Sequence, residues 1–265
     1  MKKLWITLTY LVFIILLIIP IIKIFTGAWE EGWDGFVEAL SRKQSLHALM
    51  MTGIIVVVVT AINTVFGVML ALYLVRAGWI GKRMKQFMNS LVDLPFAVSP
   101  VIGGLMIVLL LGPSSIMGAF FEDIGFKVVY ALPGMILATL FVTFPLMVRE
   151  VMPVLQEIGS QQEEAASTLG AYSWYTFWHV TWPSIRWGVI YGVVLTVARS
   201  LGEFGAVLVV SGNIMNKTQT ATTLVYQDVE NFNVIAANSI ALVLAAFSVG
   251  LLLLMEWAKK RKEVH

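Results

Sequence analysis

Residues 46–75 read LHALMMTGIIVVVVTAINTVFGVMLALYLV, and apart from His47 this run contains no side chain that carries a charge near neutral pH. A bilayer span needs about 20 apolar residues in a helix, so the run is long enough to cross. Inside lipid, every backbone N–H and C=O must bond within the protein, which favours a helix over an isolated strand. The run therefore predicts a transmembrane helix.

Five other windows of the chain are also nearly free of charge, and each is long enough to cross a bilayer as a helix. They cover residues 4–22, 86–121, 128–148, 187–215 and 231–255. Of the 265 residues, 58% are hydrophobic and only 13% are charged, against about 25% in a soluble domain. This composition excludes an ordinary soluble enzyme, a disordered chain and a nucleic-acid-binding module. We predict an all-α polytopic membrane protein with six transmembrane helices.

The lysines and arginines predict the orientation of these helices. With the N-terminus inside, 12 basic residues fall on the cytoplasmic side and 5 on the external side. The cytoplasmic residues are Lys2, Lys3, Arg76, Lys82, Arg83, Lys85, Arg149, Arg186, Lys259, Lys260, Arg261 and Lys262. The external residues are Lys23, Arg42, Lys43, Lys127 and Lys217. Because cytoplasmic loops are enriched in Lys and Arg, both termini are predicted to lie in the cytoplasm.

The predicted organisation is a single transmembrane domain over residues 1–265. Residues 1–45 are expected to hold a peripheral first helix and an external loop, and residues 46–257 a five-helix core. A cytoplasmic loop over residues 153–183 interrupts that core. The first apolar run is longer than the core of a signal peptide, which is about 7–15 residues, so a retained helix is favoured over a cleaved signal.

Several residues inside the windows bear on helix shape and packing. Pro95, Pro100 and Pro145 indicate kinks or breaks, although proline is common in membrane helices in general. Gly188 and Gly192 form a small-xxx-small pair that would allow a neighbouring helix to approach closely. With 21 glycines in the chain, chance spacing is the alternative explanation.

The segment between the fourth and fifth windows is polar and far longer than a connection requires. Residues 156–170 read QEIGSQQEEAASTLG. Ser160 followed by Glu163 predicts a capping box that starts a short helix, and Gly170 predicts its end. A second short helix, rich in aromatic residues, is expected over residues 173–180, and Pro183 then suits the start of a new helix.

This cytoplasmic knob, residues 156–183, has two possible uses. It could be a docking surface for a soluble partner, or it could lie on the lipid headgroups, which its aromatic residues would favour. Glu157, Glu163 and Glu164 are acidic, whereas the anionic cytoplasmic leaflet attracts Lys and Arg. The docking surface is therefore the preferred interpretation.

The knob also resembles the EAA loop of ABC importer permeases. That pattern is E-A-A, three residues, Gly, nine residues, Ile, one residue, Leu-Pro. The matching residues here, at identical spacing, are Glu164, Ala165, Ala166, Gly170, Val180 in place of Ile, Trp182 in place of Leu, and Pro183. By this resemblance, these residues couple the membrane domain to an ATPase subunit.

The likeness extends over about residues 45–257 and is closest to sulfate and thiosulfate permeases of the CysW type. The stretches that carry it are residues 93–101, 144–150, 186–196, 198–207 and 210–212. Molybdate and tungstate permeases share much of this pattern, so the family is better specified than the anion. Sulfate or thiosulfate is the preferred substrate class, and molybdate or tungstate is the alternative.

The resemblance implies a type I ABC importer permease fold and a set of partners. Two ATPase subunits would bind ATP and Mg, a second permease would complete the pathway, and an extracytoplasmic sulfate-binding protein would deliver the anion. The second permease is either a related distinct chain or another copy of this one. The expected location is a bacterial-type plasma membrane, where the chain contacts lipid and no nucleic acid. The chain is expected not to be an enzyme by itself.

Charges inside the spans are candidates for the transport path. Arg199 and Glu203 are four residues apart, so on a helix they share a face and can pair. Such a pair either lies near the pathway or its gate, or is a structural ion pair that locks helices together. Asp93 could cap its helix or pair with a basic residue of the 82–85 loop. A break near Pro100 could also expose backbone N–H groups to an anion.

Several motifs of self-sufficient enzymes are missing. The sequence has no G-x-x-x-x-G-K-[ST], no H-E-x-x-H and no G-x-S-x-G. It has no cysteine, which excludes a disulfide scaffold and a Cys-ligated metal site. We therefore predict no catalytic residue, no metal site and no cofactor in this chain. A membrane scaffold that recruits a cytoplasmic protein without transport is the alternative of another class.

Overall fold

The computed structural model describes residues 2–78 and 81–263, with side chains described for residues 5–16, 18–78 and 81–259. These residues form helices without any strand. In chain order the helices are α1 Lys2–Phe13, a π-helical segment Ile14–Ile18, α2 Ile19–Ala28, α3 Gly32–Ser41, α4 Lys43–Arg76, α5 Lys82–Ala97, α6 Pro100–Leu111, α7 Ile116–Asp123, α8 Leu132–Ile158, α9 Gln161–Thr168, α10 Ser173–Thr176, a second π-helical segment Phe177–Thr181, α11 Trp182–Leu201, α12 Gly205–Ser211, α13 Ala221–Glu230 and α14 Val234–Glu263.

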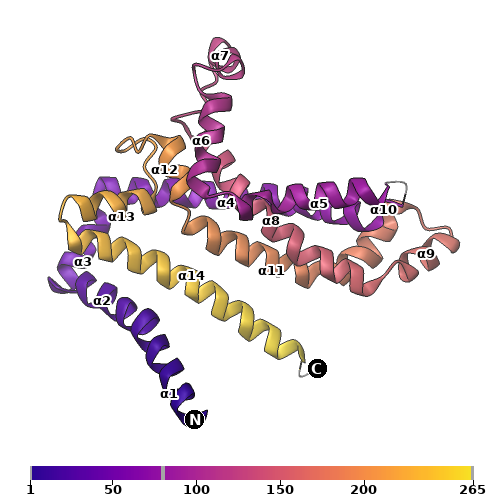
Figure 1. Cartoon of the computed structure of the whole chain (residues 1–265), viewed down its shortest axis with the longest axis horizontal. Helices are drawn as coiled ribbons and strands as arrows, with labels where there is room; N and C mark the ends of the chain where they lie inside the picture. The colour runs from indigo at the N-terminus through magenta and orange to yellow at the C-terminus, as the bar shows by residue number, and fades with distance from the viewer. Residues whose placement is uncertain (1, 79–80, 264–265) are drawn as a thin grey trace.

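A bundle of α4, α5, α8 and α11 runs along the longest axis of the molecule (Figure 1). At one end, α3 and α13 lie together, and at the other end α9 and α10 form a small cap. Helix α14 packs against α2, α11 and α13, while α6 and α7 project away from the bundle. Both α1 and α14 run away from the end that holds α3 and α13. This direction agrees with the prediction that both termini are on one side, although the basic side chains at residues 2–3 and 260–262 lie outside the described side chains.

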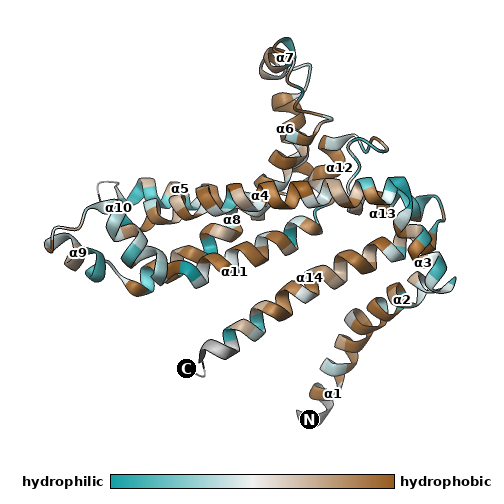
Figure 2. Cartoon of the chain, turned by 180° about the vertical axis from the view of Figure 1, so that it is seen from behind, coloured by the Kyte–Doolittle hydropathy of each residue, from teal (hydrophilic) through white to brown (hydrophobic). Residues whose placement is uncertain are grey.

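Apolar residues cover most of these helices, and Figure 2 shows them along most of α6 and along α14 up to its charged C-terminal end. Five helices are long and apolar enough to cross a membrane, at residues 5–28, 43–76, 132–158, 173–201 and 234–259. A bent pair, α5 with α6, passes the same test as one span. Counting that pair, the described residues contain the six predicted spans.

The third span is broken instead of continuous. Helices α5 and α6 meet at an angle of 109°, with the break at Val98 and Ser99. Proline disfavours helical geometry in the residue before it, and Ser99 is accordingly extended at ψ 138°. Pro100 then occupies the first turn of α6, where its missing N–H costs nothing. The predicted break at Pro100 is confirmed, whereas α5 continues through Pro95 and α8 through Pro145 without a break.

The fifth span is displaced from its predicted window of residues 187–215. The helical path starts at Ser173, passes through α10 and the second π-helical segment, and ends at Leu201. Pro183 lies in the first turn of α11, as predicted, but α11 follows the π-helical segment without a break in the helical path. The π-helical segment immediately before it loosens the backbone pattern, which lets the helix continue past a residue without an N–H. Gly202 follows the last helical residue.

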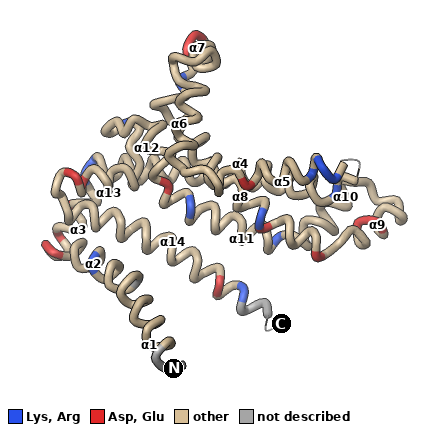
Figure 3. The backbone as a smooth tube through the Cα atoms, in the orientation of Figure 1, with Lys and Arg blue, Asp and Glu red and all other residues tan. Residues whose placement is uncertain are grey.

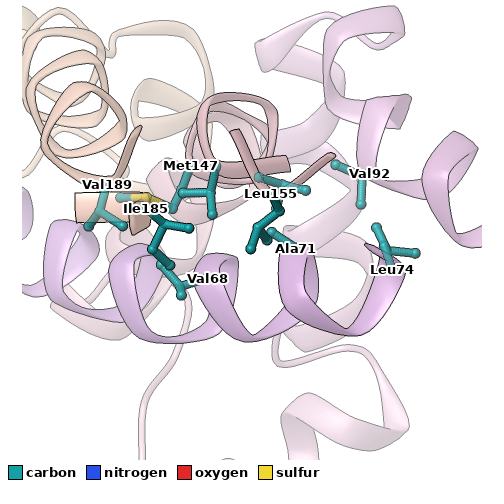
Figure 4. Packing of buried hydrophobic residues seen from close by; sticks show 10 residues of the cluster. Val68, Ala71, Leu74, Val92, Met147, Leu155, Ile185 and Val189 are labelled. Atoms are coloured by element: carbon teal, nitrogen blue, oxygen red, sulfur yellow. The ribbon is translucent and has the colours of Figure 1, made fainter. Parts of the chain in front are cut away.

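Buried apolar side chains hold the bundle together (Figure 4). Val68, Ala71 and Leu74 of α4 pack against Met147 and Leu155 of α8, with Ile185 and Val189 of α11 and Val92 of α5 completing the cluster. The predicted close approach at the two glycines of α11 is confirmed. A Cβ at Gly192 would lie 2.6 Å from the Met147 sulfur, and one at Gly188 would lie 3.1 Å from the Glu150 carbonyl oxygen.

Candidate functional site

The cytoplasmic knob is the short helix α9, joined by the predicted sharp turn to the start of the helix that continues into α11; the sequence predicts two separate short helices here, and only the first is separate. Helix α9 ends at Thr168, and Gly170 follows with φ +88°, a conformation that L side chains rarely adopt. Gly159 before α9 has φ +68°, so a glycine marks each end of the short helix. The space around both glycines is open, because a Cβ at either would meet nothing within 4 Å. Only the backbone conformation thus restricts these positions.

The residues of the EAA-like pattern lie in two different parts of the knob. Glu164, Ala165 and Gly170 are exposed in α9 and its turn, and Ala166 is half-buried there. By contrast, the half-buried Val180 and the exposed Pro183 belong to the helix that continues into α11. We call α9 with its turn at Gly170 the tip of the knob, and the start of the following helix, residues 173–183, its stem. The pattern has residues in both parts, and the tip is the more exposed one.

The predicted capping box is wrong. The Ser160 hydroxyl accepts no bond from a backbone N–H of α9, and it instead donates to the Glu164 side chain, to Oε1 at 2.5 Å. Glu163 turns toward the bundle, where its carboxylate pairs with Arg76 of α4 at 2.7 Å. Arg76 is distant in the sequence but close in space, and the Glu163 carboxylate bonds to it instead of to the backbone N–H at the start of α9. A bond between two charged groups is stronger than a bond to a neutral backbone N–H.

Exposed aromatic residues surround the stem of the knob. Tyr172, Trp174, Tyr175 and Trp178 are all exposed, and Trp174 packs edge-on against Trp178 with ring centroids 5.6 Å apart. The His179 ring stacks on Tyr175 at a centroid distance of 3.9 Å. This stem is amphipathic and can face lipid headgroups, whereas the acidic tip carries no aromatic residue.

Figure 3 shows that charged residues gather at the ends of the helices, and that few lie along their middle. Arg199 and Glu203 lie at one such end, where the fifth span breaks beside the break in the third span. Helix α6 lies against α12 so closely that a Cβ at Gly104 would be 2.6 Å from the Ala206 carbonyl oxygen. A Cβ at Gly205 would lie 3.1 Å from a Val101 methyl group. The break after α5 and the break after α11 therefore pack directly on one another.

Arg199 and Glu203 form the predicted ion pair at this junction. Arg199 Nη2 lies 2.9 Å from Glu203 Oε2, and the side chains are 40% and 1% exposed. The two residues do not share a helix, since α11 ends at Leu201 and Glu203 belongs to the break. Glu203 Oε1 accepts a bond from the Ala206 N–H at 3.0 Å, in the first turn of α12.

A cavity of about 450 Å³ opens beside this pair. It is lined by residues 95–100 of the first break, by Val142 and Leu146 of α8, and by Arg199. Glu203 does not line it. The arginine is therefore the charged side chain that borders this cavity, and its cationic head can meet an anion there.

Asp93 does not pair with the basic 82–85 loop, and that prediction is wrong. Its two carboxylate oxygens accept bonds from Arg149 of α8, at 2.8 Å from Nε and 2.5 Å from Nη2. Residues 82–85 form the first turn of α5, about two to three helical turns from Asp93, so tertiary packing brings a different cation closer. The bidentate pair ties α5 to α8 beside the first break.

Two further polar links were not predicted from the sequence. Arg76 joins α4 to Glu163, and Arg42 joins the start of α4 to Asp228 of α13 at 2.7 Å. Both arginines were interpreted only as markers of topology. The one signal available was that each lies at an end of an apolar run, where a helix leaves the bilayer. Within the described residues, no group of three His, Asp or Glu side chains could hold a metal ion.

The chain matches a known transport family and solved structures. Residues 63–264 match the model of the "binding-protein-dependent transport system inner membrane component" family. The sulfate transport system permease protein CysW of Synechocystis is 44% identical over 100% of this chain and 95% of its own length. The sulfate transport system permease protein CysT of Escherichia coli K12 is 34% identical over 92% of this chain and 87% of its own length.

A chain in the crystal structure of a bacterial alginate ABC transporter has the same fold. It superposes with a TM-score of 0.80 over 98% of this chain and 94% of that chain, at 18% sequence identity. The apolar helices, the exposed knob and the two relatives all indicate a membrane-spanning permease. The chain is a multi-pass membrane protein with the type I permease fold, and it belongs to the inner membrane components of binding-protein-dependent transport systems, among the CysW-type permeases.

Proposed function

We propose that this chain is the permease subunit of an ATP-driven importer for sulfate or thiosulfate. The observation that carries the proposal is α9, an exposed helix with no buried residue that stands at one end of a bundle of membrane-spanning helices. A bundle without an ATP-binding motif needs a source of energy, and such a helix can receive it from a partner. The substrate follows from relatives whose names specify sulfate transport.

The partners follow from the same proposal. Two ATPase subunits hold ATP and Mg and dock on the cytoplasmic knobs of two permeases. CysW and CysT relatives are both similar to this chain, which supports a heterodimer of related permeases over a pair of identical copies. A sulfate-binding protein delivers the anion from outside a bacterial plasma membrane. ATP-driven closure of the ATPase pair moves the knobs together and turns the cavity outward.

The anion path is proposed to pass the junction of the two breaks. Arg199 borders the cavity of about 450 Å³ and supplies positive charge there. Glu203 holds that arginine in place from a buried position, and Asp93 with Arg149 fixes the other wall by joining α5 to α8. Opening and closing at this junction would then gate the path.

Reversing the charge of Glu164 tests the docking role of the knob. In detergent-solubilised complexes, Glu164→Lys is expected to weaken retention of the ATPase subunit at least about tenfold. We expect the surface that receives this acidic helix to be basic, and like charges placed across an interface cost several kcal/mol. Gly170→Asp is expected to lower sulfate uptake as well, since a residue with a Cβ is strained at φ +88° by about 1–2 kcal/mol.

Glu122→Lys on α7 is the matched control, because it makes the same charge change on the exposed arm far from the knob. It should retain the ATPase subunit like the parent chain. Unchanged retention in Glu164→Lys would remove the docking assignment. ATP hydrolysis that fails to respond to a loaded binding protein would instead support a scaffold that does not transport.

Competition experiments test the anion. Uptake of radiolabelled sulfate is measured in cells that express the complete transporter. It is expected to fall in the presence of excess thiosulfate and to change little in the presence of molybdate at the same concentration. Sulfate and thiosulfate are chemically close tetrahedral dianions, so one site can accept both through the same donors. Stronger competition by molybdate or tungstate than by thiosulfate would assign the importer to those anions.

A further inference from the structure

Helix α9 is not attached to the bundle by apolar packing. None of its residues, from Gln161 to Thr168, is buried. A cavity of about 420 Å³ separates part of it from α4 and α10, with Leu72, Ser167 and Thr176 among its lining residues. A helix that must pass movement to the bundle therefore needs another attachment, and polar contacts are the ones present.

Arg76 provides a fixed point at the end of α4. Its Nη2 donates to the Gly159 carbonyl at 2.6 Å and its Nη1 to the Leu155 carbonyl at 3.2 Å. Leu155 lies in the last turn of α8 and Gly159 directly follows the helix, where carbonyl oxygens lack helical partners and carry partial negative charge. The two terminal nitrogens of the guanidinium are thus held at the end of α8 independently of α9, and its Nε–H can donate to another group.

Glu163 uses both of its oxygens to join α9 to this fixed point and to α11. Oε2 accepts from Arg76 Nε at 2.7 Å, and Oε1 accepts from the Thr181 hydroxyl at 2.8 Å. Thr181 is buried in the π-helical segment that continues into α11. The side chains of Arg76 and Glu163 are only 22% and 20% exposed, so water screens this pair less than an open surface pair.

We propose that Glu163 is the positioning residue that transmits movement of α9 to α4, α8 and α11. This inference rests on the proposed function, because it assumes that an ATPase subunit moves α9. The neighbouring Glu164 is exposed and bonded to Ser160 within the knob, so the two adjacent acids face different ways. Glu164 is available to a partner, whereas Glu163 is occupied by the bundle.

The test measures coupling separately from docking. The complete transporter, with its ATPase subunits, second permease and binding protein, is reconstituted in lipid vesicles, and sulfate uptake is measured together with ATP hydrolysis. Glu163→Ala is expected to lower the sulfate carried per ATP about tenfold, within the range that mutations along a coupling network produce. ATP hydrolysis and retention of the ATPase subunit should stay within about twofold of the parent, a change too small to disturb an interface.

Two conservative variants distinguish transmission from a general loss of structure. Glu163→Gln keeps one acceptor for Arg76 and a polar group for Thr181, so it should recover most of the transport per ATP. Thr181→Val preserves shape and removes only the hydroxyl, and it should lower the ratio about threefold, which corresponds to the lower part of the range for loss of one ordinary hydrogen bond, because Arg76 still holds the Glu163 carboxylate. Gln161→Ala is the control on the same helix, where an exposed polar side chain is removed and the ratio should not change.

The outcomes separate this inference from the proposed function. Parent-like sulfate transport per ATP in both Glu163→Ala and Thr181→Val would overturn the transmission role, while a docking defect in Glu164→Lys would leave the proposed function standing. Loss of ATPase retention in Glu163→Ala and Glu163→Gln would also overturn it, because Glu163 would then be a docking residue. If Glu163→Ala does not fold, the sulfate carried per ATP is compared between the parent, Glu163→Gln and Thr181→Val instead.

Discussion

Arg199→Met alone is expected to destabilise the protein and abolish sulfate uptake. The Glu203 side chain is 1% exposed, and Arg199 is the cation beside it, at 2.9 Å. Removing the cation leaves the buried Glu203 carboxylate uncompensated; this costs about 3–5 kcal/mol in a fully buried pair and less here, because solvent already screens the 40% exposed Arg199. Thermal unfolding in detergent should show a lower midpoint, and membranes should contain less of the folded chain.

The double variant Arg199→Met with Glu203→Leu separates structure from transport. It removes both charges, so folding should recover much of the lost stability, apart from the bond that Glu203 makes to the Ala206 N–H. Uptake is nevertheless expected to remain at least about tenfold lower, because the cavity then lacks the cation that attracts the anion. Full recovery of uptake in the double variant would show that Arg199 is structural and lies off the path.

Gly104→Val is expected to be the most damaging single change to the membrane core. A Cβ at this position would lie 2.6 Å from the Ala206 carbonyl oxygen and 3.0 Å from the Ala206 Cα, and backbone atoms cannot move aside as a flexible side chain can. Overpacking costs about 1–3 kcal/mol and sometimes more, so α6 would have to separate from α12. The measured result should be poor folding in membranes and loss of uptake.

Gly53→Ala is the matched control for that prediction. Gly53 is exposed in the middle of α4, and a Cβ there would meet nothing within 4 Å. Alanine favours a helix over glycine by about 0.5–1 kcal/mol, so this variant should fold and transport at least as well as the parent. Normal folding and uptake in Gly104→Val would show that the two breaks can move apart without consequence.

The number of spans, their helical nature and the position of the knob were predictable because each depends on local properties of the chain. A run without charge such as residues 46–75 must be helical in lipid wherever its neighbours lie. Gly170 was recognisable as a turn because few other residues tolerate positive φ. The proline that begins α6 likewise indicated a break at its own position.

The direction of that break and the partners of the charged residues were not predictable in this way. Nothing in the residues near Pro100 specifies an angle of 109°, because the angle depends on how Gly104 fits against Ala206, about a hundred positions away. The predicted window of the fifth span, residues 187–215, differs from the observed helix, residues 173–201, because an absence of charge does not mark where a helix begins or ends. Ser173–Thr181 is helical despite its polar residues, and Gly202 ends α11 inside an apolar run.

Local patterns in the residues are enough to identify this chain as a bundle of membrane-spanning helices with an exposed knob. What each charge does depends on how those helices pack. Glu163 was assigned to a local cap but pairs with Arg76, which is 87 positions away, and Asp93 pairs with Arg149, which is 56 positions away. The physical reason is that apolar patterns act through the solvent at each position, whereas an ion pair forms with whichever opposite charge the packed helices bring within about 4 Å.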